Sequence, residues 1–242
     1  MENLAGILKN EFRVGLSVEN FEHIAQHLPP GSELMPECGI PMVCFCDIPL
    51  SQVEKHMKNY GDYGLGLRKT WGMKKGVSPI LYTHPNSPAP FSSADHINLI
   101  GSLGFDRAPD DQKALALNAG LFVYLQKPYE GFLRRTKGPK KKVRFYDERE
   151  WRYIPTEIES IPAMSPEDLA DPIKSKPVRD EVSRLPPLAF EPNDINYIVV
   201  ATDAEMLPMV RAVRSIKGKY DADTVDLLTS KIISAERIRE DF

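Results

Sequence analysis

The residue types that could do chemistry are concentrated in two parts of the sequence. The first part carries Asp47, His56, Tyr60 and Tyr63, which we expect to contribute to one ligand-binding site. Each residue also has a structural interpretation. An aspartate before Ile-Pro often accepts hydrogen bonds from turn amides. A histidine and a tyrosine four residues apart share a helix face, whether that face meets a ligand or the core. The two tyrosines flank a glycine, so their rings would cover either a ligand or the core edge.

The second part is the segment EREWRYIP, residues 148–155. Strand alternation would place Glu148, Glu150 and Arg152 on one face of the strand. Two glutamates beside an arginine are costly to bury unless they are paired or functional. We therefore predict Glu150, and after it Glu148, as candidate catalytic carboxylates. The alternative is an exposed edge strand that its charges protect from pairing with other chains.

A dense run of positive charge precedes this segment. Such a run could grip a phosphate backbone and give salt-dependent binding to nucleic acid. The alternative is a solvated hairpin balanced by the acidic residues just downstream. The run consists of Arg134, Arg135, Lys137, Lys140, Lys141, Lys142 and Arg144.

The three cysteines predict neither a disulfide framework nor a metal site. An odd, small number of cysteines in a chain of this size fits a reducing compartment. Cys38, Cys44 and Cys46 do not have the usual zinc spacing, and His56 would have to complete the ligand set from a separate element. Nothing places a histidine and a carboxylate beside a cysteine, as a thiol nucleophile requires. We expect no metal, and cysteines that act as small buried hydrophobic residues.

The first half of the chain must supply the elements that position these residues. Ser51 and Glu54 form a capping-box pattern, which predicts a helix that Gly61 ends. A helix is also expected at 4–8 and a helical turn at 70–76, with strands at 42–48, 63–68 and 78–83.

The second half begins with a polar, proline-bearing loop at 84–95. Residues 110–127 form the longest helix candidate, and the basic run is expected on a Gly-Pro turn between two extended or fraying segments. Residues 156–194 are proline-rich and predict a surface-wrapping segment with one short helix from Ser165. Strands are expected at 195–202 and 224–228, with a helix at 203–215 between them.

Together these elements predict an α+β protein, with a central mixed β-sheet flanked by helices. We expect a single domain over 1–242, in which the strand-helix-strand of 195–242 completes the sheet. With 42% apolar residues, no apolar run near 18 residues and no N-terminal signal segment, a cytoplasmic protein with no membrane span is expected. The net charge of −3 says little about partners.

Four segments carry a resemblance to a known family. ENLAGILKNEF, PMVCFCDIPLSQVEKHMKNYGDYGLGLRKTW, SPILY and EREWRYIP resemble the abortive-infection AbiGi family of bacterial phage-resistance proteins. The resemblance covers most of residues 1–155, and the central motif is long enough to be specific. It implies a role in phage defence, in a family described as the antitoxin half of a two-gene system, and a cognate toxin or antitoxin partner encoded nearby.

A weaker resemblance, to ADP-ribosyltransferase-like folds, implies a mechanism. NAD would lie between the 44–82 region, including Asp47 and His56, and the Glu150 strand. Glu150 or Glu148 would bond the ribose and stabilise positive charge as nicotinamide leaves. Tyr60 or Tyr63 would stack on the nicotinamide, and the loop 136–142 would meet the target. Relatives in the AbiGi family begin with an additional strand that carries His-Phe-Thr before the first helix, and in transferase-like folds a residue on that strand holds the NAD ribose. Because this sequence starts at Met1, we expect either a shortened chain or catalysis that does not use that strand.

Two hypotheses about function follow from these resemblances. The first is an NAD-dependent transferase that modifies a macromolecule such as nucleic acid. The second is a non-catalytic antitoxin or sensor that uses the same surface to hold a partner toxin or a phage component.

Overall fold

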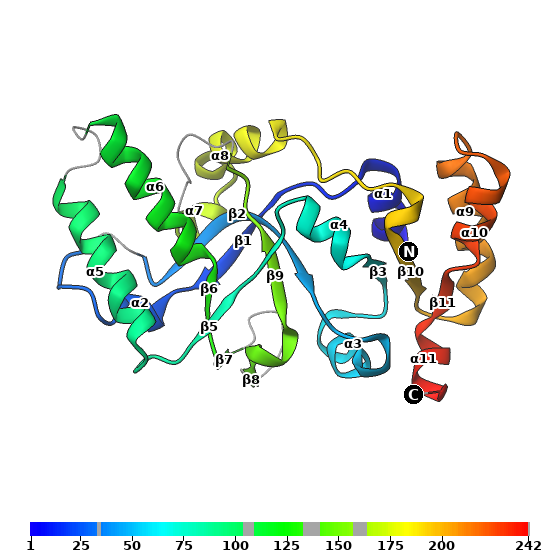
Figure 1. Cartoon of the computed structure of the whole chain (residues 1–242), viewed down its shortest axis with the longest axis horizontal. Helices are drawn as coiled ribbons and strands as arrows, with labels where there is room; N and C mark the ends of the chain where they lie inside the picture. Colours follow the sequence, from blue (N-terminus) through cyan, green and yellow to red (C-terminus); the bar gives the residue numbers. More distant parts are fainter. Residues whose placement is uncertain (33–34, 104–108, 133–140, 157–163, 242) are drawn as a thin grey trace. The chain divides into compact units, whose positions relative to one another are not determined.

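The computed structural model describes residues 1–32, 35–103, 109–132, 141–156 and 164–241. Contacts group the chain into two compact units, and each is described here by itself. Unit 1 comprises 1–13, 47–78 and 186–242, and unit 2 comprises 14–46 and 79–185. The predicted α+β class is confirmed, but the strands of the described residues form several small sheets in place of one central sheet (Figure 1). The expected single domain stays a prediction.

Among the described residues, the largest sheet has four strands and belongs mainly to unit 2. Its order is β1 (Gly15–Asn20), β2 (Glu37–Cys46), β9 (Glu150–Tyr153) and β4 (Ser78–Pro79), and β4 spans the sequence boundary between the units. β2 pairs antiparallel with both β1 and β9. Because β9 lies between β2 and β4, the edge-strand interpretation of 148–155 is wrong. The predicted strand is confirmed at Glu150–Tyr153, whereas Glu148 lies in a 3₁₀ turn before it.

Three helices of unit 2 bury an apolar cluster with this sheet. They are α2 (Glu22–Ala25), α5 (Pro88–Leu103) and α6 (Asp110–Tyr124), and α5 lies beside α6 (Figure 1). The cluster includes Phe21, Ile40 and Val123. The predicted loop at 84–95 is wrong, since most of it belongs to α5. Pro88 and Pro90 fall in the first turn of α5, where the missing N–H groups would have no intrahelical partner in any case.

Short paired strands complete unit 2. β5 (Leu81–Thr83) runs parallel to β6 (Gln126–Pro128), and β7 (Glu130–Phe132) runs antiparallel to β8 (Lys142–Arg144). The predicted strand at 78–83 is therefore divided between two sheets. A 3₁₀ turn, η3 (Phe145–Glu148), joins β8 to β9.

The proline-rich segment contains more helix than predicted. Ser165 caps α7 (Pro166–Ala170), as expected. A second helix, α8 (Pro172–Arg184), was not predicted; Asp171 caps it, and Pro172 occupies its first position. Proline is compatible with the first position of a helix. Pro177 lies inside α8, where it removes a backbone hydrogen-bond donor, and the helix nevertheless continues past it, so the proline content misled the prediction.

Unit 1 contains a mixed three-stranded sheet in the order β11 (Ile232–Ser234), β10 (Ile195–Val200) and β3 (Gly64–Leu67). The turn η4 (Pro192–Asp194) leads into β10, and the turn η5 (Asp203–Glu205) follows it. Three helices come after η5 in the described residues: α9 (Met206–Lys217), α10 (Ala222–Thr229) and α11 (Ala235–Asp241). The predicted strand at 224–228 is wrong because Asp221 caps α10 there by accepting from the Thr224 amide. The last strand follows α10.

The N-terminal part of unit 1 largely follows the sequence prediction. It contains α1 (Glu2–Asn10), α3 (Glu54–Tyr60) and α4 (Lys69–Lys74). Gly61 ends α3 with a φ of 100°, a backbone conformation that favours glycine. The predicted capping box is wrong: a 3₁₀ turn, η1 (Leu50–Gln52), precedes α3, and no side chain caps that helix.

Buried His23 is expected to make the protein sensitive to mild acid. It is 4% exposed, and neither ring nitrogen has a hydrogen-bond partner among the described residues. Burial, and then the nearby His27, lower the pKa of His23 to about 4. Because the unfolded chain binds this proton more tightly, the stability that neutral His23 contributes is present above about pH 6.5 and is lost towards pH 4.

The test compares His23→Phe with the wild type in chemical unfolding at pH 7.5 and pH 4.5. We expect the wild type to lose about 2 kcal/mol more unfolding free energy than the variant over this interval. The control is His96→Phe, at an exposed position, which should follow the wild type. Equal acid sensitivity of His23→Phe and the wild type would contradict the assignment.

Candidate functional site

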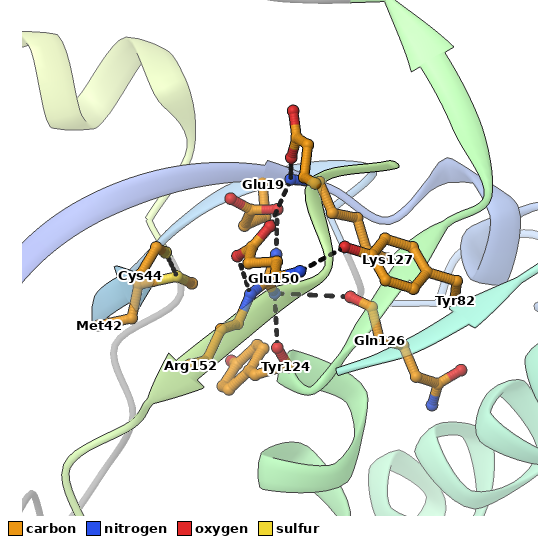
Figure 2. Close-up of polar contacts among 10 residues, drawn as sticks. Glu19, Met42, Cys44, Tyr82, Tyr124, Gln126, Lys127, Glu150 and Arg152 are labelled. Carbon is orange, nitrogen blue, oxygen red and sulfur yellow. Dashed lines mark hydrogen bonds and ion pairs between the residues drawn. The ribbon is translucent and has the colours of Figure 1, made fainter. Parts of the chain in front are cut away.

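Glu150 lies at the centre of a buried ionic network in unit 2 (Figure 2). It is 4% exposed, and both carboxylate oxygens are engaged. Oε1 accepts from Arg152 Nε at 2.6 Å, and Oε2 accepts from Lys127 Nζ at 2.6 Å. The Glu150 amide donates to the Tyr82 hydroxyl at 2.8 Å. The candidate carboxylate that sequence reasoning ranked first is therefore fixed from two sides.

Arg152 connects Glu150 to other elements (Figure 2). Its Nη2 donates to Glu19 Oε2 at 2.7 Å, and its Nη1 donates to the Tyr124 carbonyl at 2.6 Å. The side chain is 1% exposed, so the guanidinium has lost its hydration and requires these acceptors. A single residue of β9 thus joins β1 and the end of α6.

Lys127 on β6 pairs with both predicted glutamates. Its Nζ lies 2.6 Å from Glu150 Oε2 and 3.2 Å from Glu148 Oε2. Burial alone would lower the pKa of Lys127, but Glu150, Glu19 and Glu148 raise it above its ordinary value. The network therefore contains three carboxylates and two cations. Strand alternation predicted that Glu148 and Glu150 share a strand face, but Glu148 lies in η3 outside the strand, and the two glutamates are joined through Lys127.

The protonation state of Glu150 follows from this environment. Burial alone would raise the pKa of its carboxyl group, but Arg152 and Lys127 outweigh burial and lower the pKa to about 2. Glu150 is thus ionised near neutral pH. With both oxygens engaged and so low a pKa, it is poorly suited to exchange a proton with a substrate.

Two exposed cysteines share this face of the sheet. Cys44 lies opposite Arg152, and Cys46 lies opposite Glu150 in the register of β2 and β9. Surrounding protein atoms and then nearby carboxylates raise the pKa of Cys46 to about 12 and the pKa of Cys44 above its ordinary range. Both thiols therefore stay protonated and weakly nucleophilic. The expectation of buried cysteines holds for Cys38 but is wrong for the other two.

The four predicted cofactor-binding residues all belong to unit 1. Asp47 pairs with Lys69 at 2.6 Å. The Tyr63 hydroxyl donates to Glu205 at 2.8 Å. The rings of His56 and Tyr60 stack with their centroids 4.4 Å apart, which confirms that they share a helix face. All four thus have partners within their own unit, and their role in binding NAD stays a prediction.

The basic run lies only partly within the described residues. Arg134, Arg135, Lys137 and Lys140 fall outside them, as does most of the loop 136–142 that was expected to meet a target. Lys142 pairs with Glu130, and Arg144 pairs with Asp147 at 2.6 Å. Lys141 is exposed. The predicted flanking extended segments are confirmed as β7 and β8. The predicted nucleic-acid contact stays a prediction.

Sequence reasoning missed Glu19 and Lys127 as members of the network. Glu19 lies 133 residues from Arg152 in the sequence, so no local pattern joins them. Tyr82 lay in the predicted 44–82 region but was not singled out. One signal was present: a charged residue in the otherwise uncharged strand Gly15–Asn20 suggests a buried partner.

Neither metal ligation nor membrane insertion is indicated by the described residues. No group of three or more histidine, cysteine, aspartate or glutamate side chains in that part of the chain is arranged to hold a metal ion. Among the same residues, no helix is both long and apolar enough to cross a membrane.

Comparison with known proteins identifies the family. Residues 17–201 match the family model described as "Putative abortive phage resistance protein AbiGi, antitoxin". The chain is also 30% identical over 250 residues to the abortive phage resistance protein AbiGi of Lactococcus lactis subsp. cremoris, an alignment that covers 93% of this chain and 96% of that protein. The chain therefore belongs to the AbiGi family of abortive phage resistance proteins. No solved structure matches it, so the resemblance to ADP-ribosyltransferase-like folds stays a prediction.

The ionic network predicts that two arginine substitutions lower the free energy of unfolding by very different amounts. Arg152→Leu leaves Glu150 and Glu19 without their shared partner inside the protein, and should lower the free energy of unfolding by about 3–5 kcal/mol. Arg144→Leu removes an exposed pair, and should cost about 0–1 kcal/mol. Chemical unfolding at neutral pH measures both values. Similar costs for the two variants would contradict the buried network.

The low pKa of Glu150 predicts a second, more acidic loss of stability. Its pKa is lowered in the folded state, so its contribution is complete above the unfolded value near 4.5 and is lost as the pH falls towards 2. Glu150→Gln removes this titration. Between pH 6 and pH 3 the wild type should lose about 2 kcal/mol more unfolding free energy than Glu150→Gln. Parallel pH curves for the two proteins would show that Glu150 is not held ionised by its partners.

Proposed function

We propose that this chain acts in abortive phage defence as a non-catalytic antitoxin, which binds and restrains a partner toxin. The observation that carries the proposal is the complete engagement of the Glu150 carboxylate by Arg152 and Lys127. The description of the matching family as an antitoxin supports the same function.

The transferase hypothesis requires a carboxylate that is free to contact the substrate, and the bonds of Glu150 to Arg152 and Lys127 oppose this. A transferase carboxylate must accept a bond from the ribose and face the positive charge that develops. Glu150 would first have to release Arg152 or Lys127, and breaking a buried ion pair costs about 3–5 kcal/mol. A binding protein needs no such release, because Glu150 can hold the sheet together while other surfaces contact the partner.

The experiment for this proposal co-expresses the chain with the product of the neighbouring gene and measures bacterial growth. We expect the wild type to restore growth that the neighbouring product inhibits, and the two proteins to co-purify. Glu150→Gln should restore growth in proportion to the folded protein that accumulates, because the carboxylate acts on stability. Glu167→Gln, at an exposed position, is the control for the same chemical change.

A nicotinamide-release assay with NAD and cell lysate separates the two hypotheses. The antitoxin proposal expects no release above that of a heat-treated sample. Release by the wild type that Glu150→Gln abolishes, although the variant is folded, would contradict the proposal and support the transferase. Failure to restore growth or to bind the neighbouring product would also contradict it.

A further inference from the structure

The strand pair β7–β8 presents an aromatic ring and two cations on one side. In its register Phe132 lies opposite Lys142, and Glu130 lies opposite Arg144, so alternation places these four side chains on one face. The opposite face carries Gly131, where an added Cβ would lie 2.7 Å from the Phe145 ring. Phe145 is buried and Phe132 is 59% exposed. One face is thus packed against the protein while the other meets solvent.

A second exposed ring follows in η3. Tyr146 is 54% exposed, and its ring centroid lies 5.7 Å from that of Tyr129 in a stacked arrangement and 5.5 Å from that of Tyr82, edge to face. The Tyr82 hydroxyl is itself held by the Glu150 amide. Because its neighbours are fixed, Tyr146 can receive a planar ligand with little further loss of conformational freedom.

The cations beside these rings can accept a new partner. Lys142 and Arg144 are exposed, and their pairs with Glu130 and Asp147 lie at the surface. Surface ion pairs of this kind are weak, so a phosphate can replace the carboxylate at little cost. Lys141 and Arg149 add exposed positive charge nearby in the sequence.

From this arrangement we propose that β7–β8 and η3 form a binding site for single-stranded nucleic acid. Bases stack on Phe132 and Tyr146, while Lys142 and Arg144 contact the phosphates. Exposed rings interleaved with cations are how proteins hold unpaired strands without reading their sequence. A duplex offers its bases only within the stack, so the rings favour single strands. The site rests on the described residues and is independent of the antitoxin proposal.

The test measures fluorescence anisotropy of a labelled oligo(dT) or oligo(U) of about 15 nucleotides, long enough to span one binding site, with the full-length protein. We expect binding that weakens as salt rises, and a duplex of equal length to bind more weakly. Phe132→Ala and Tyr146→Ala should each raise the dissociation constant about fivefold or more. Phe122→Ala, at another exposed aromatic position of unit 2, is the matched control and should bind as the wild type does.

The charge and ring contributions are tested separately. Lys142→Gln combined with Arg144→Gln should weaken binding and reduce the salt dependence by about one or two released counterions. The proposal is overturned if the wild type does not bind either oligonucleotide up to about 100 µM, the weak end of non-specific binding. It is also overturned if both alanine variants bind as the wild type does while circular dichroism shows them folded. Equal binding of an acidic polypeptide such as polyglutamate would assign the surface to an acidic protein partner instead.

Discussion

The buried guanidinium of Arg152 is the constraint on which unit 2 depends. A fully desolvated cation is tolerated only where acceptors surround it, and here Glu150, Glu19 and the Tyr124 carbonyl fill that role. Such networks contribute less net stability than their short distances suggest, because desolvation offsets most of the attraction. Their effect is on geometry, since any other register of β9 against its neighbours would leave a charge unpaired.

The need to surround Arg152 with acceptors changes how the candidate site around Glu150 is interpreted. A glutamate, an arginine, a lysine and a tyrosine gathered around one point resemble a catalytic site when only their residue types are considered. Here, however, both oxygens of Glu150 are already bound and its pKa is low. Burial among surrounding protein atoms, and then the nearby carboxylates, raise the pKa values of the neighbouring cysteines and keep their thiols protonated. The network is therefore better suited to hold elements together than to transform a substrate.

Membership of the AbiGi family and the structure together make the exposed surfaces of the protein a better guide to its function than the buried Glu150 carboxylate. A protein that restrains a partner needs a stable shape, which a buried network can provide without contacting that partner. The exposed ring of Tyr146 in η3 is linked to Glu150 indirectly, because the Glu150 amide holds Tyr82, whose ring contacts Tyr146. In this way the ionic centre influences a surface to which it contributes no exposed group.

The sequence by itself determined the features that are local. It identified the family, the glycine that ends α3, the Ser165 cap of α7 and the alternation that places Glu150 and Arg152 on one face. These succeed because a cap or a strand period involves only a few adjacent residues. Local reasoning failed where proline content concealed α5 and α8. Proline is tolerated in a first helical turn, and α8 also continues through Pro177 in its interior. Only the tertiary structure decided that Glu19 and Lys127 meet Arg152 and Glu150. These contacts arise from the order of the strands and from pairing between distant segments, which no periodicity along the sequence reveals.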